Sequence, residues 1–116
     1  MWARLDDQLI DHPKVAVAGK AIGPNGRVIA LGFFSMALMW CNKHLSDGVL
    51  PLEVVAGFRS YVVHPVSVAD ALVHAGLFEK HNRGYRIHDY TDYNPTASQV
   101  KKRRADRHAA RVNGRE

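Results

Sequence analysis

The chain has 116 residues, 47% of them hydrophobic, and a formal net charge of +5 at pH 7. This length and composition allow one domain with its own hydrophobic core, which needs no metal or disulfide support. The single cysteine, Cys41, excludes a disulfide framework, and the first eleven residues include three acids and no apolar signal segment, so we expect a reducing compartment.

The positive charge is confined to the end of the chain. Residues 1–95 contain nine Lys or Arg and nine Asp or Glu, whereas residues 96–116 contain seven basic and two acidic residues. A basic terminal segment is typical of proteins that bind polyanions, nucleic acid before acidic membranes. We therefore expect a domain over residues 1–93 and a basic helical tail over residues 94–116.

The first predicted helix follows an opening segment of mixed polarity, in which Leu5, Leu9 and Ile10 are expected to face inward. Pro13 is suited to the first turn of a helix, and the pattern predicts a helix over residues 13–21. The sequence Gly23-Pro24-Asn25-Gly26 has turn residues at every position and ends this helix.

The longest predicted helix covers residues 27–43. Residues 28–41 carry no charge and exceed the length of an ordinary strand, while a membrane span needs about 20 apolar residues, so we expect a core helix and no membrane partner. A helix that is apolar on every side must be covered on every side. We therefore expect a homodimer with part of this helix, or the segment around Trp2, at its interface.

A short strand and a short helix come next. Residues 49–50 predict a minimal strand, and Pro51 can start a helix over residues 52–58. Residues 59–66 read as a connector. This connector is longer than the turn of about three or four residues in a standard helix-turn-helix.

A second helix and a β-hairpin complete the predicted domain. Ser67 and Asp70 match a capping-box pattern ahead of a helix over residues 68–75, so we expect Asp70 to cap its own helix. Residues 77–88 alternate in polarity on both sides of residues 81–84, which predicts a hairpin with a four-residue tip. The expected fold is mainly α with a small β wing, that is, a winged helix-turn-helix plus a C-terminal basic helix.

A family resemblance accompanies this element order. It is carried by five short motifs, which are Trp2-Ala3-Arg4-Leu5-Asp6, His12-Pro13-Lys14-Val15, Asp47-Gly48-Val49-Leu50-Pro51, Ala71-Leu72-Val73-His74-Ala75-Gly76-Leu77-Phe78 and Gly84-Tyr85-Arg86-Ile87-His88-Asp89-Tyr90. Over residues 2–95 the chain resembles phage and prophage proteins of Gram-positive hosts and the N-terminal winged-helix part of phage replication-initiation (DnaD-like) proteins. The resemblance implies double-stranded DNA binding in replication initiation or transcription regulation, replication proteins as partners, and the cytoplasm of a bacterial host cell.

The second helix of a winged helix normally enters the major groove. Here it would present Ser67 and His74 but no Arg, Lys, Asn or Gln, the residues that make paired hydrogen bonds to base edges, so we expect it to read bases weakly. In the hairpin, Lys80, Arg83 and Arg86 are candidates for phosphate or minor-groove contacts, with a solvated loop as the alternative.

The basic tail is the strongest indication of DNA binding in the sequence. Four consecutive cations repel one another, so we expect this segment to be frayed until a polyanion neutralises it, and we expect its DNA binding to depend steeply on salt. The alternatives are a solubilising tail or the start of a longer helix. The candidate DNA contacts in the tail are Lys101, Lys102, Arg103, Arg104, Arg107 and Arg111.

No residue pattern indicates catalysis. The chain lacks a glycine-rich phosphate loop and a Ser/His/Asp arrangement, and its seven histidines do not have the spacing of metal ligands. We expect a binding protein with no catalytic residues, no metal and no cofactor. The rival hypothesis is a protein-interaction or oligomerisation module without sequence-specific DNA binding, which the very apolar helix and the uncharged second helix favour.

Overall fold

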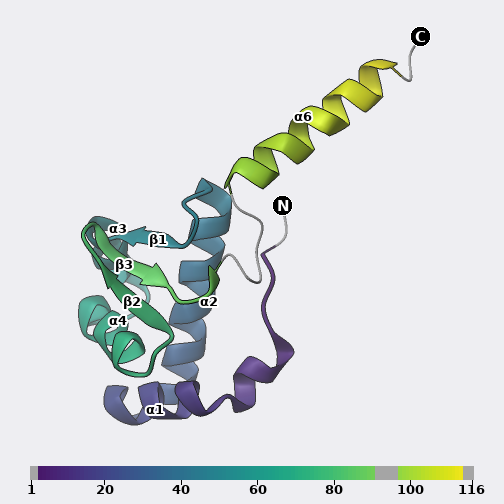
Figure 1. Ribbon diagram of the computed structural model, residues 1–116. Coiled ribbons are helices and arrows are strands. Elements are labelled where there is room, and N and C mark those ends of the chain that lie inside the picture. Colours follow the sequence, from purple (N-terminus) through teal and green to yellow (C-terminus); the bar gives the residue numbers. More distant parts are fainter. Residues whose placement is uncertain (1–2, 91–96, 114–116) are drawn as a thin grey trace.

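A computed structural model describes residues 3–90 and 97–113 of the chain (Figure 1). The protein is mainly helical, with a small three-stranded antiparallel sheet, as the sequence predicts. In chain order the elements are the 3-10 helix η1 (Asp7–Asp11), α1 (Pro13–Ile22), α2 (Gly26–His44), β1 (Val49–Pro51), α3 (Leu52–Gly57), the 3-10 helix η2 (Phe58–Ser60), α4 (Pro65–His74), β2 (Phe78–His81), β3 (Gly84–Ile87) and α6 (Ala97–Asn113).

Helix α2 is the central helix of the fold. It contacts α1, α4 and β1, and its buried Phe33 packs against the rings of Phe58 and Phe78, with centroid distances of 5.4 and 6.3 Å. Its outer face is not covered, because Val28 and Met39 remain 72% and 54% exposed. The prediction of a central helix is confirmed, and one apolar face of α2 is left open by the single chain.

Helices α1 and α2 meet at a close contact of two glycines. The turn between them bends the chain by 111°, and a Cβ on Gly26 would overlap the backbone of Gly19. Only glycine permits this approach. Across residues 3–90 and 97–113, no single helix is both long and apolar enough to cross a bilayer, and α1 and α2 reach that threshold only when they are taken together across this bend.

The N-terminal segment departs from the prediction. Leu9 is buried in the core, as expected, but Leu5 and Ile10 are more than half exposed. Leu9 and Ile10 lie in η1, and a 3-10 helix has three residues per turn, so neighbouring residues point in different directions. The expectation that all three side chains face inward was therefore wrong for two of them.

The sheet has the strand order β1-β3-β2 and separates an inner from an outer face (Figure 1). Tyr85 pairs with Leu50 across the β1–β3 ladder, and both are buried against the helices. Arg86 pairs with Val49 on one side and with Glu79 on the other. Because successive side chains of a strand point to opposite faces, Arg86 and Glu79 lie on the outer face, where both are exposed.

The hairpin tip is shorter than predicted. The strands continue to His81 and Gly84, which face each other, so the turn consists of two residues and not four. The carbonyl of Arg83 accepts a hydrogen bond of 2.9 Å from the N–H of Leu52, and a Cβ on Gly84 would collide with the backbone of residues 50–52. The tip is thus fastened to the start of α3, a contact that the local sequence of the hairpin does not reveal.

The helix pair also differs from the prediction. Helix α4 begins at Pro65, which occupies the first turn, while η2 extends α3, so the connector consists of residues 61–64 and not 59–66. The N-cap residue is His64, without a side-chain cap. Asp70 therefore lies in the middle of the helix, and the predicted capping box does not form.

Helix α6 projects from the body as a separate rod (Figure 1, yellow-green), and the molecule measures 60 × 29 × 23 Å along its principal axes. Residues 97–113 of the predicted tail form this helix, whereas the sequence led us to expect a segment that is frayed in the absence of a polyanion. The predicted boundary between residues 93 and 94, like Trp2, lies outside the described residues.

Candidate nucleic-acid interface

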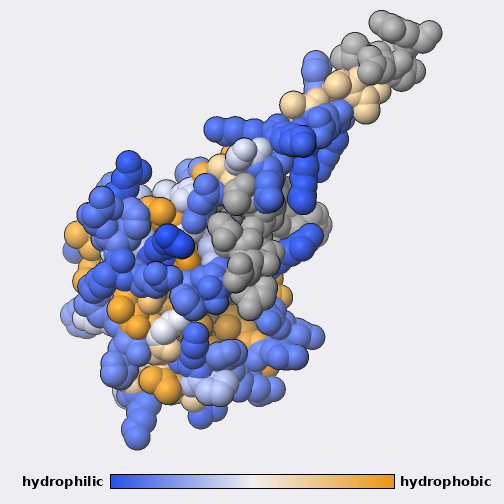
Figure 2. Space-filling model, in the orientation of Figure 1, coloured by the Kyte–Doolittle hydropathy of each residue, from blue (hydrophilic) through white to orange (hydrophobic). Residues whose placement is uncertain are grey.

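The basic residues of α6 are all exposed, and most of them share one side of the helix. Arg103, Arg107 and Arg111 are four residues apart and form one stripe, with Arg104 beside it, while Lys101 and Lys102 point away from it. None of these cations forms an ion pair with another described residue. Figure 2 shows hydrophilic side chains gathered over the base of the projecting helix.

The first turn of α6 is attached to the body. The N–H of Ala97 donates a hydrogen bond of 2.6 Å to Oδ1 of Asp47, and Val100 is only 2% exposed. Val100 lies on the same side of the helix as Arg103, Arg104 and Arg107, which follow it by three, four and seven residues. The side that touches the body at the base thus becomes the cationic side further out.

The attachment point is itself well ordered by packing. Asp47 adopts a positive φ of 54°, and Tyr90 lies directly against the neighbouring Gly48. Burial raises the pKa of Tyr90 to about 12. No partner was assigned to Asp47 from the sequence, because nothing local indicates a partner fifty residues away.

On α4, the predicted contacts Ser67 and His74 are both exposed. They are seven residues apart and therefore share a face, with Asp70 between them. Asp70 accepts hydrogen bonds from Nζ of Lys80 (2.8 Å) and from the hydroxyl of Tyr85 (2.6 Å). The bond from Lys80, followed by that from Tyr85, lowers the pKa of Asp70.

The three cations of the hairpin differ in how freely they could contact DNA. Lys80 is held by Asp70 and also lies 4.8 Å from the centre of the Tyr85 ring, and Asp70 raises its pKa. Arg83 and Arg86 are exposed, and Arg86 stands opposite Glu79. The pKa of Glu79 is lowered by its hydrogen bond to His88 and, to a smaller extent, by Arg86. Of the three predicted hairpin contacts, Lys80 is the one already neutralised within the fold.

An exposed apolar group, which the sequence did not single out, lies where the connector enters α4. Tyr61 and Val63 are 73% and 77% exposed, and Val66 in the first turn of α4 is also exposed. Large apolar side chains at the surface mark contact sites more often when they are grouped than when they are scattered.

The predicted contacts form two separate groups. Lys80 joins the hairpin to α4, so the residues of these elements lie on one part of the body, whereas α6 leaves the body near the end of α2, away from α4 (Figure 1). Within the described ranges, no three His, Cys, Asp or Glu side chains lie close enough to hold a metal ion, and His88 contacts Glu79 and Asp89.

No protein-family model matches the chain, and neither the curated proteins nor the solved structures include a significantly similar one. The resemblance to phage replication-initiation proteins therefore stays a prediction.

Proposed function

We propose that the chain is a winged-helix DNA-binding protein of phage type, and that α6 provides most of its affinity for double-stranded DNA. The observation that carries this proposal is the exposed, unpaired set of cations on an attached helix. Phosphates that meet such cations release condensed counterions, which favours binding of any DNA sequence.

The winged-helix assignment rests on the order of the body elements. A strand is followed by two helices and a hairpin, β1 joins the hairpin through β3, and the connector of residues 61–64 has the length of a helix-turn-helix turn. In this assignment α4 is the helix that faces DNA and the hairpin is the wing.

In this proposal α4 positions the protein and does not read a sequence. Its exposed face offers Ser67 and His74, and its acid, Asp70, is paired with Lys80. Arg83 and Arg86 contact phosphates from the hairpin, while the tail holds the backbone further along the duplex. Such contacts fix the orientation of a protein but carry no sequence information. The role would be in replication initiation or transcription regulation, with replication proteins as possible partners.

Truncation after Val100 tests the proposal. Deleting residues 101–116 removes seven cations and two acids but leaves the buried Val100 and the bond between Ala97 and Asp47 in place. We expect the body to melt at the same temperature and to lose most of its affinity for random duplex DNA, with a much weaker dependence on salt. Unchanged affinity in the shortened protein would refute the role of the tail.

A second candidate function, protein interaction, is favoured by the exposed apolar side chains. Tyr61, Val63 and Val66 surround the start of α4, and Val28 and Met39 remain open on α2. In this alternative the α2 face pairs two copies, as the sequence predicts. Sedimentation equilibrium of the wild type, of Met39→Asp and of Val63→Asp distinguishes the cases. A dimer that only Met39→Asp dissociates supports pairing through α2, and a monomer at high concentration excludes it.

A further inference from the structure

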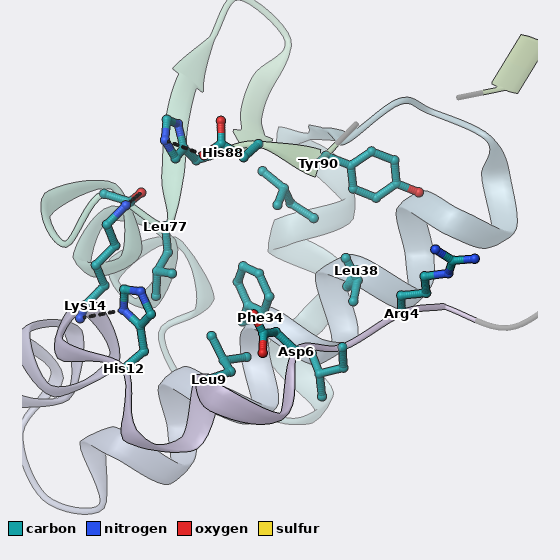
Figure 3. Close-up of a pocket in the computed structure, with 14 residues that line it drawn as sticks. Arg4, Asp6, Leu9, His12, Lys14, Phe34, Leu38, Leu77, His88 and Tyr90 are labelled. Atoms are coloured by element: carbon teal, nitrogen blue, oxygen red, sulfur yellow. Dashed lines mark hydrogen bonds and ion pairs between the residues drawn. The ribbon is translucent and has the colours of Figure 1, made fainter. Parts of the chain in front are cut away.

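A cavity of about 350 Å³ lies between the N-terminal segment and the body, away from the cations of α6 (Figure 3). One wall comes from residues 4–9, the floor from α2, and the other wall from the ends of the hairpin strands. Pockets that bind small ligands have volumes of about 300–1,000 Å³, so this one suits a small molecule and not a protein helix.

Most side chains in the middle of the cavity are apolar, and Asp6 lies beside Phe34 there (Figure 3). The side chains of Leu9, Phe34, Leu38 and Leu77 point into the same space (Figure 3). Leu5, which is half exposed, also lines the cavity. Leu9, Leu38 and Leu77 are already buried. An apolar chain placed there would therefore mainly remove the partly buried Phe34 and the exposed Leu5 from water.

Two hydrogen-bond donors stand at one end of the cavity, and both come from the start of α1. Nζ of Lys14 donates one hydrogen bond of 3.3 Å to the carbonyl of Gly76 and has two further hydrogens. Nδ1 of His12 accepts a hydrogen bond of 3.1 Å from the N–H of Lys14, so in the neutral ring the hydrogen is on Nε2. This end therefore offers an ammonium and an imidazole N–H.

The other charged groups of the lining have partners within the protein. Asp6 accepts a hydrogen bond from the N–H of Gln8, and Asp89 contacts Nε2 of His88, whose Nδ1 lies 2.9 Å from Glu79. Arg4 lies beside Tyr90 at the end opposite Lys14 (Figure 3). The carboxylates of Asp6 and Asp89 thus already have partners within the protein. Nζ of Lys14 and Nε2 of His12, in contrast, can still donate hydrogen bonds to an anion.

We propose that this cavity binds a small amphipathic carboxylate, of the kind formed by a medium-chain fatty acid. The hydrocarbon chain covers Leu9, Phe34 and Leu77, and the carboxylate accepts hydrogen bonds from Nζ of Lys14 and Nε2 of His12. The site is independent of the proposed DNA binding, since it uses none of the tail or hairpin cations.

Titration with octanoate, followed by amide resonances of the full-length protein, tests this site. We expect saturable shifts at Leu9, Lys14 and Leu77. Acetate, which lacks the chain, and octyltrimethylammonium, which has the opposite charge, should not saturate these signals. The absence of saturable octanoate shifts would refute the site, and equal binding of octyltrimethylammonium would refute its preference for an anion.

Two variants locate the carboxylate. Lys14→Gln should weaken octanoate binding about tenfold, because it removes a charged hydrogen-bond donor. Lys20→Gln, a matched change on the same helix, should have no effect, since Lys20 does not line this cavity. Leu5→Asp, a change at an exposed position of the lining, should also weaken binding without disturbing the core. Equal effects of the two lysine changes would overturn the assigned orientation.

Discussion

The body and the tail use their charges in opposite ways. In the body, acids and bases balance over residues 1–95, and several pair with one another, as Asp70 does with Lys80 and Glu79 with His88. On α6 the cations are exposed and have no described ion-pair partner. The pairs of the body are exposed and add little to its stability, whereas a row of like charges attracts an anionic partner.

The same comparison holds for the forces that keep the helices formed. Helices α1 and α2 each bury one face in the core, but beyond its first turn the apolar side chains of α6 are small, and three arginines are spaced four residues apart. Like charges at this spacing cost a few tenths of a kcal/mol per pair, and an isolated helix of this length is marginal in water. The hydrogen bond from Ala97 to Asp47 is therefore a contribution of the body to the first turn of the tail.

The largest expected effect comes from neutralising the tail without shortening it. Replacing Arg103, Arg104, Arg107 and Arg111 by glutamine should weaken binding to random duplex DNA roughly 100-fold near 0.1 M salt and reduce the salt slope by about 3 to 4. The matched control replaces four cations of the body, Lys20, Arg27, Lys43 and Arg59, by glutamine. Fluorescence anisotropy over a salt series measures both, and equal losses would remove the distinction between tail and body.

The attachment of the tail gives the next effect. Asp47→Gly removes the carboxylate that accepts from Ala97 but keeps a residue that tolerates the positive φ, so it should cost about 1 kcal/mol of helix stability. We expect faster amide hydrogen exchange over residues 97–104 and a few-fold loss of DNA affinity. Asp89→Gly, also at a positive φ but not bonded to α6, is the control. Unchanged exchange in Asp47→Gly would mean that Val100 alone holds the helix.

The elements that the sequence predicted well are those with local signals. Pro13, the turn at residues 23–26 and the uncharged stretch of residues 28–41 fix α1 and α2 to within about two residues at each end. The charge imbalance likewise predicted a basic helix at the end of the chain. In these cases the residues that determine the structure are neighbours in the sequence.

Several of the failures involve partners that are distant in sequence. Asp70 was assigned to its own helix cap, but its partners Lys80 and Tyr85 follow ten and fifteen residues later. The hairpin tip contacts Leu52 at the start of α3, and Asp47 reaches α6. A capping pattern describes what a residue can do locally, and it cannot show that a tertiary partner competes for the same carboxylate.

A smaller effect, on stability alone, should follow from Asp70→Asn. Removing a charged acceptor of two hydrogen bonds should lower the free energy of unfolding by about 1 kcal/mol at pH 7. The pKa of Asp70 is lower in the folded protein than its usual value of 3.8. Its stabilisation is therefore complete above the unfolded-state pKa and is lost as the pH falls through the lower folded-state pKa.

Urea unfolding from pH 7 to pH 2.5 measures this effect. The difference between wild type and Asp70→Asn should stay constant down to about pH 5 and shrink below about pH 4. Asp7→Asn, a change at an exposed acid, should show no such difference. If Asp70→Asn unfolds like the wild type at every pH, the contact between α4 and the hairpin contributes nothing to stability.

The smallest expected effect on DNA affinity concerns the contacts that the body makes through the hairpin and α4. Arg83 and Arg86 offer phosphate contacts from the outer side of the sheet, whereas Ser67 and His74 are the groups that α4 would place in a groove. Replacing both arginines by alanine should weaken binding only a few-fold, by a similar factor for every duplex, and reduce the salt slope by about 2.

Changing Ser67 and His74 to alanine should leave binding to random duplexes unchanged, because neither residue is a lysine or arginine or makes paired contacts to a base. A selection from random sequences, made with the wild type and with this double variant, provides the comparison. If the wild type enriches one sequence and the variant loses it, α4 reads bases although its exposed face has no lysine or arginine. The tail would then supply affinity and the body specificity, and the two regions would differ by task and not by whether they touch DNA.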